Sequence, residues 1–171
     1  PGGIGSVIPY VLKIFWPNGL AIEPVMIHNR GSVETIPFTF GGFAADLDGH
    51  VKLMSTKTVS ATKPCVTCEN VTNYIDLASR PQGILVGIDC CKPKKFIYNS
   101  DADIYAKADQ LHNLATHNDS TKVQLEALEI EYGMNYNKRG LLWDPDLRGI
   151  YKPATHMLRD PLHMLVSNGI A

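Results

Sequence analysis

The chain lacks several features that would place a protein in a class at once. No apolar run approaches the roughly 18 residues that a membrane span needs. Its start has neither the basic segment nor the small-residue cleavage site of a secretory signal. Its 171 residues include only 4 cysteines, which without such a signal argue against a disulfide scaffold. Internal repeats and low-complexity tracts are also missing. We therefore expect a folded, intracellular, soluble protein with no membrane partner.

Net charge is also small, because 16 Lys+Arg stand against 17 Asp+Glu. The overall charge thus provides no electrostatic argument that the protein binds nucleic acid. The charges are unevenly spread: residues 101–131 carry 2 Lys+Arg and 7 Asp+Glu, whereas residues 132–171 carry 5 and 3. We interpret the acidic stretch as a solvated helical face that would point away from a phosphate backbone.

The first half of the chain predicts short, mixed elements. Residues 4–16 are mostly apolar, and we interpret them as a buried element. The alternation over residues 32–40 predicts a half-buried edge strand. Residues 43–45 resemble the end of a core strand, with an acid directly after it. A short helix within residues 49–60 and a short buried strand over residues 84–88 are expected next.

Two helices with clear end signals are expected in the second half. The first begins at Ser100 or Asp101, and the second opens with the capping-box spacing of Thr121 and ends at Gly133. The predicted buried face of the first helix is Ile104, Ala108, Leu111 and Ala115. The predicted buried face of the second helix is Val123, Ala127 and Ile130. Residues 134–158 contain many helix breakers and are expected to be irregular, before a last helix at Asp160.

Cysteines provide the strongest candidate metal site. Cys65 and Cys68 form a Cys-x-x-Cys pair, which is the usual half of a tetrahedral zinc site. One or both of Cys90 and Cys91 would complete it. The fourth ligand is left open between the other cysteine, a ligand outside the chain, and a histidine such as His50 or His163. Thiols without a metal, a redox pair and a disulfide remain as alternatives to structural zinc.

Three further residues are candidates for a catalytic site. Asp160 precedes a proline and would cap a helix, and His163 falls three positions later, where carboxylate and imidazole could converge on a metal. Asp46 would sit at the tip of the strand over residues 43–45, as a carboxylate able to hold Mg²⁺. The simpler alternative for both acids is capping and turn chemistry.

These motifs together resemble a known family. Ala45-Asp46 followed by Thr62 to Cys68 is similar to the core of eukaryotic CACTA- and Plavaka-type DNA transposases. Gly140 to Asp144 and Arg159 to His163 resemble the later part of the same proteins, including their Asp-x-x-His signature. The closest likeness is to divergent transposase-like proteins of protists, and it covers roughly residues 40–171.

The resemblance implies an α/β (mixed α+β) chain with a partial ribonuclease-H-like core and a zinc-stapled, largely helical insertion. Residues 1–48 would be the N-terminal strands and helix of the core, residues 49–100 a zinc-knuckle-like segment, and residues 101–171 the helical insertion. It implies Mg²⁺-dependent cleavage and transfer of DNA strands in the nucleus. Asp46 would be the second of three catalytic acids, and Asp160 and His163 would support the site.

The same resemblance implies that the chain is an excerpt of a longer protein, because neither the first acid nor the third, a Glu, is identified within it. The isolated piece would then be inactive. Two alternatives remain: a non-catalytic zinc-stabilised binding module, from a domesticated or decayed element, and an unrelated α+β domain. The oligomeric state stays unknown.

Overall fold

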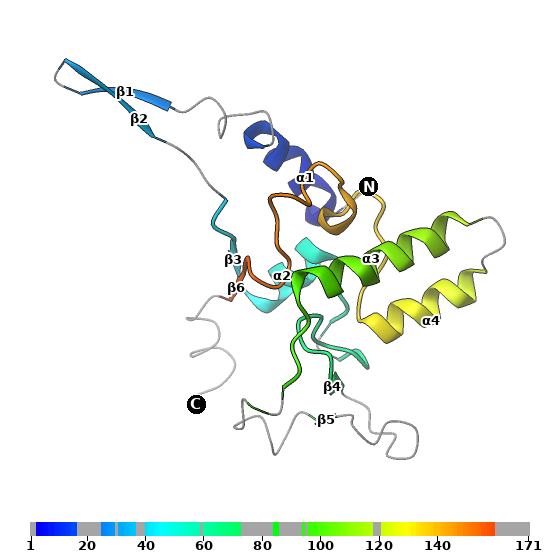
Figure 1. Ribbon diagram of the computed structural model, residues 1–171. Coiled ribbons are helices and arrows are strands. Elements are labelled where there is room, and N and C mark those ends of the chain that lie inside the picture. Colours follow the sequence, from blue (N-terminus) through cyan, green and yellow to red (C-terminus); the bar gives the residue numbers. More distant parts are fainter. Residues whose placement is uncertain are drawn as a thin grey trace.

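The computed structural model describes residues 3–16, 25–29, 31–36, 40–58, 60–72, 84–85, 94, 96–117 and 121–159, which form a mixed α+β chain (Figure 1). The order of elements is α1 (Ile4–Phe15), β1 (Val25–Asn29), β2 (Ser32–Ile36), β3 (Phe43–Ala45), α2 (Leu47–Met54), β4 (Val71–Thr72), β5 (Ile84–Leu85), α3 (Asp101–Thr116), α4 (Lys122–Tyr132), the 3-10 turn η2 (Leu141–Trp143) and β6 (Met157–Arg159). The mixed fold class is confirmed, while the three-segment division of the chain stays a prediction. None of the described helices is long and apolar enough to cross a membrane.

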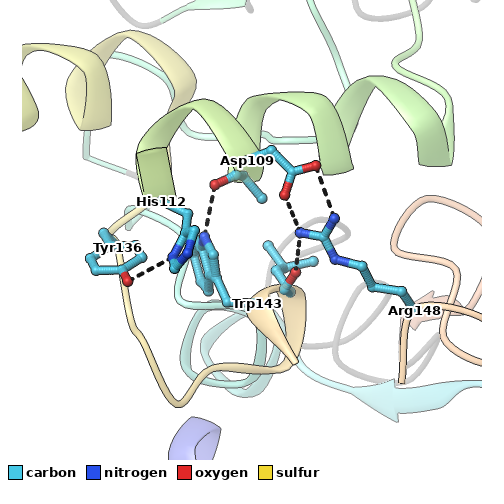
Figure 2. A network of polar contacts seen from close by, with 7 residues as sticks. Asp109, His112, Tyr136, Trp143 and Arg148 are labelled. Carbon is cyan, nitrogen blue, oxygen red and sulfur yellow. Dashed lines mark hydrogen bonds and ion pairs between the residues drawn. The ribbon is translucent and has the colours of Figure 1, made fainter. Parts of the chain in front are cut away.

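The core forms where α3 meets the stretch that follows α4. The indole Nε1 of Trp143, in η2, donates to the carbonyl of Ala108 at 2.8 Å (Figure 2). Nearby, the Arg148 guanidinium binds both carboxylate oxygens of Asp109 and lies 4.9 Å above the ring of Tyr105. The largest fully buried side chains are Met54, Ile104, Leu111, Met134, Leu141, Leu142, Leu147, Tyr151 and Pro153. Most of them lie between residues 134 and 153, so the stretch expected to be irregular supplies much of the core.

A short parallel sheet joins two distant parts of the chain. β3 pairs with β6 in the register Phe43–Met157, Ala44–Leu158 and Ala45–Arg159. An aromatic group covers its start, since the Phe43 ring lies 5.0 Å from Phe40 and 5.7 Å from Tyr151. The sheet therefore draws its stability from the packing around it as well as from its few backbone hydrogen bonds.

The carboxylate of Asp101, at the start of α3, holds the loop that leads into β6. Its oxygens accept from the backbone N–H of Ala154 at 2.6 Å, from that of Thr155 at 3.2 Å and from the Thr155 hydroxyl at 2.7 Å. Partial burial raises the pKa of Asp101, but these hydrogen bonds, together with the electrostatic effect of His156, lower it by more, so that the pKa lies below the ordinary 3.8. The charged form of Asp101 is thus the one that holds the loop.

For two N-terminal elements, the helix within residues 4–16 and the strand that begins at residue 32, the predicted degree of burial was wrong. α1 packs against α2 with Gly5, Pro9 and Leu12, but its opposite face is open rather than buried. The exposed apolar residues of that face are Ile4, Val7, Tyr10, Val11 and Ile14. β1 and β2 form an antiparallel hairpin that projects from the rest of the molecule (Figure 1). Residues 32–35 are exposed, not half-buried, because no other element covers the hairpin within the described residues.

The ends of α3 and α4 agree with the predictions made from the sequence, and so does much of the buried face of α3. α3 starts at Asp101 after the N-cap Ser100, as predicted, and Ser100 also forms a capping box. Thr121 forms the predicted capping box, and Gly133 ends α4 in the left-handed conformation, as predicted. Ile104, Ala108 and Leu111 are buried in α3. The predicted face of α4 was wrong, because Val123 and Ile130 are 73% and 52% exposed. Its other apolar stripe, Leu125, Leu128 and Tyr132, packs on the core instead.

We predict that Asp101→Asn destabilises the protein in a pH-dependent way. Because the pKa of Asp101 is lower in the folded chain than in the unfolded one, its stabilisation is present above about pH 4 and is lost as the pH falls through the folded-state pKa. At pH 7 the substitution should lower the free energy of unfolding by about 1–2 kcal/mol. Urea denaturation at pH 7 and pH 3 should show the wild-type advantage shrinking in acid.

Asp48→Asn is the matched control, since Asp48 is exposed and bonds only its helical neighbour Lys52 among the described residues. Its effect should be small at both pH values. An Asp101→Asn variant as stable as the Asp48→Asn variant at pH 7 would show that the loop does not depend on this carboxylate.

Candidate functional site

Asp46 lies where the sequence predicted it, directly after β3, and its side chain is exposed. It is also the N-cap of α2: its Oδ1 accepts a hydrogen bond from the backbone N–H of Gly49 at 2.7 Å. Capping and metal binding are compatible, because an ionised carboxylate has about four acceptor sites. A Cβ at Gly49 would lie 2.9 Å from that same oxygen, so a glycine there leaves room for the carboxylate.

The partner strand β6 ends one residue before Asp160 in the sequence. Arg159 is paired with Ala45 at the carboxyl end of the sheet, and Asp160 follows Arg159 directly in the chain. Asp160 and His163, together with the helix expected there, lie outside the described residues. The strand β6 was not predicted, since residues 157 and 158 belong to the stretch expected to be irregular.

His50 reaches the same sheet from α2. Its side chain is only 3% exposed, and its Nε2 lies 2.9 Å from the carbonyl oxygen of Leu158 in β6. His50 was one of the histidines considered as a fourth zinc ligand. Within the described part of the chain, no three or more His, Cys, Asp or Glu side chains gather closely enough to hold a metal ion, so His50 does not complete a site with Cys65 and Cys68.

The cysteine turn is held by the segment that precedes α3. Cys68 forms an isolated antiparallel bridge with Tyr98, with backbone hydrogen bonds on both sides of it. The buried side chain of Asn99 adds a bond to Val66 O at 2.7 Å and accepts one from Lys107 of α3 at 2.8 Å. The turn lies in a loop between α2 and β4, with Cys68 buried and Cys65 half-buried. Cys90 and Cys91 lie outside the described residues.

An open pocket of about 880 Å³ is lined by Cys68 of the cysteine turn, by Asp101 in the first turn of α3 and by Met157 of β6. Phe96 and Tyr98 also line it, and their rings are stacked with centroids 6.3 Å apart. No local pattern in the sequence predicts this pocket, because its lining residues come from three separate segments.

Comparisons of the chain with protein-family models, with curated proteins and with solved structures found no match. The transposase resemblance accordingly rests on the short motifs quoted above.

Proposed function

We propose that the chain belongs to the catalytic region of a metal-dependent enzyme that cleaves and transfers DNA strands, as its motifs suggest. The observation that carries this proposal is the parallel register of β3 and β6. Parallel strands end at the same edge of a sheet, and Ala45 and Arg159 form the last pair. The two residues that follow this pair in the sequence are Asp46 and Asp160, both carboxylates.

In this proposal the two carboxylates share a divalent cation such as Mg²⁺. Oxygen ligands suit this ion, which keeps several waters and uses one or two carboxylates from the protein. The cation would lower the pKa of a bound water or of a DNA 3′ hydroxyl, and it would stabilise the charge that develops on the phosphodiester. The exposure of Asp46 agrees with the role, since the acid must reach water, ion and phosphate.

The proposal includes a structural zinc ion on the cysteine turn. Two findings support it: Cys65 and Cys68 occupy one loop, and the chain after Cys91 returns to that loop at Tyr98. In the sequence, Cys91 precedes Tyr98 by only seven residues. Zinc would then fix the loop that forms one wall of the pocket.

We predict that Asp46→Asn weakens divalent-cation binding, because it removes a charge at nearly constant shape. In calorimetric titrations of the 171-residue chain with Mn²⁺, the affinity should fall by about tenfold or more. Asp160→Asn should have a similar effect. In a longer protein that contains the remaining acids, Asp46→Asn should abolish DNA strand cleavage without loss of folding.

Asp48→Asn is again the matched control, since it removes the same charge two residues away. Equal Mn²⁺ affinities for Asp46→Asn and Asp48→Asn would place the cation elsewhere. DNA cleavage that survives Asp46→Asn in the longer protein would contradict the catalytic role.

We predict that the purified chain carries about one zinc ion and that Cys68→Ser removes it, because serine is a poor zinc ligand. Metal analysis by mass spectrometry measures the content directly. Thr67→Ser, inside the same turn, should retain zinc. A wild-type chain prepared without chelators that contains no zinc would overturn the structural zinc site.

A further inference from the structure

Two aromatic rings, those of Phe96 and Tyr98, line the open pocket next to the cysteine turn. The rings stack on each other at an interplanar angle of 29°. Tyr98 is nevertheless 65% exposed, so its ring still presents surface to solvent. An aromatic ring prefers to stack in an offset arrangement on another flat ring, and an exposed ring in a pocket wall therefore suits a flat, unsaturated ligand.

The backbone on both sides of Tyr98 is fixed. The carbonyl of Ile97 accepts from the backbone N–H of Glu69 at 2.7 Å. The backbone N–H of Asn99 donates to the carbonyl of Thr67 at 2.9 Å. Because these bonds hold the segment against the cysteine turn, the aromatic pair needs little further ordering when a ligand binds. A site arranged in advance in this way lowers the entropic cost of binding.

The charges near the pocket distinguish a base from a phosphate. The carboxylate of Asp101 lines the pocket, and its bonds to the loop before β6 use three of about four acceptor sites. This negative charge repels a phosphate, whereas the remaining site can accept from the amino group of a base. Two residues before Phe96, Lys94 is exposed, and Lys92 and Lys95 belong to the same stretch of the sequence. Positive charge beside the aromatic pair suits the phosphates that flank a bound base.

We propose that this pocket binds a base of a single-stranded nucleic acid, with the base stacked on the ring of Tyr98 and a flanking phosphate near Lys94. Aromatic side chains next to basic residues are the usual means of holding single strands. The pocket volume of about 880 Å³ is within the range of ligand sites. The inference rests on the proposed function only in the choice of DNA as the strand, since strand transfer involves DNA ends. The pocket itself involves neither Asp46 nor a cation.

Fluorescence anisotropy of the 171-residue chain with a labelled DNA strand of about 12 nucleotides tests the proposal, without added Mg²⁺ or Mn²⁺. Tyr98→Ala should weaken binding by about tenfold or more, because the stacked base loses its partner. Tyr98→Phe keeps the ring and should bind as the wild type does. Tyr10→Ala is the matched control, since Tyr10 is 63% exposed but lies on α1, and this variant should bind normally.

Two further measurements separate the parts of the site. Lys94→Gln should weaken binding and reduce the salt dependence of the affinity by about one phosphate contact. A duplex of the same sequence should bind about tenfold more weakly than the single strand, because its bases are already stacked on one another. Equal affinities for strand and duplex would show that unpaired bases do not enter the pocket and would overturn the inference.

The inference and the proposed function fail in different ways. If the wild type binds no strand, or if Tyr98→Ala binds as tightly as Tyr10→Ala, the pocket is not a base site, while Mn²⁺ titration of Asp46→Asn still decides the cation site. If strand binding depends on Tyr98 but Asp46→Asn leaves Mn²⁺ binding unchanged, the base site stands and the proposed function fails.

A measurement on the wild type covers the case in which Tyr98→Ala does not fold. The ring-proton resonances of Tyr98 should move upfield when the strand is added, because a stacked base shields these protons, and those of Tyr10 should stay in place. Unchanged Tyr98 resonances at saturating strand would overturn the inference.

Discussion

β3 and β6 pair in parallel although more than a hundred positions of the chain lie between them, and the candidate site depends on this pairing. Each strand has three residues, which is too short for the sheet to be stable alone. The register decides which side chains meet at its carboxyl edge. A shift by one residue would end the sheet at a pair other than Ala45 and Arg159 and would reverse the face of each side chain.

Three separate contacts hold the register. Asp101 fixes the loop before β6 through three hydrogen bonds, His50 ties β6 to α2, and the rings of Phe43 and Tyr151 pack at the start of the sheet. Each contact joins α2, α3 or β3 to the stretch of residues 151–158. The acidic α3 thus has a structural role at its first residue, in addition to the solvated face predicted from its charges.

Local signals in the sequence predicted the parts of the fold that local interactions decide. The capping boxes at Ser100 and Thr121 define helix starts through bonds within four residues, so those starts were correct. The buried face of α4 depends on how it packs against α3, and two apolar stripes compete for it, so that prediction was wrong. β6 and the bond from His50 to Leu158 join residues more than a hundred positions apart, which no local pattern encodes. Asp46 was placed correctly because the strand, the acid and the glycine are neighbours in sequence.

Paramagnetic broadening of backbone amide resonances by Mn²⁺ tests the central claim most directly, since it reports which segments approach one bound ion. The account predicts that small amounts of Mn²⁺ broaden the amides around Asp46 and around Asp160 together, before those of the acidic helix α3. Broadening of only one of the two segments, or of α3 first, would contradict a metal site at the carboxyl edge of β3 and β6.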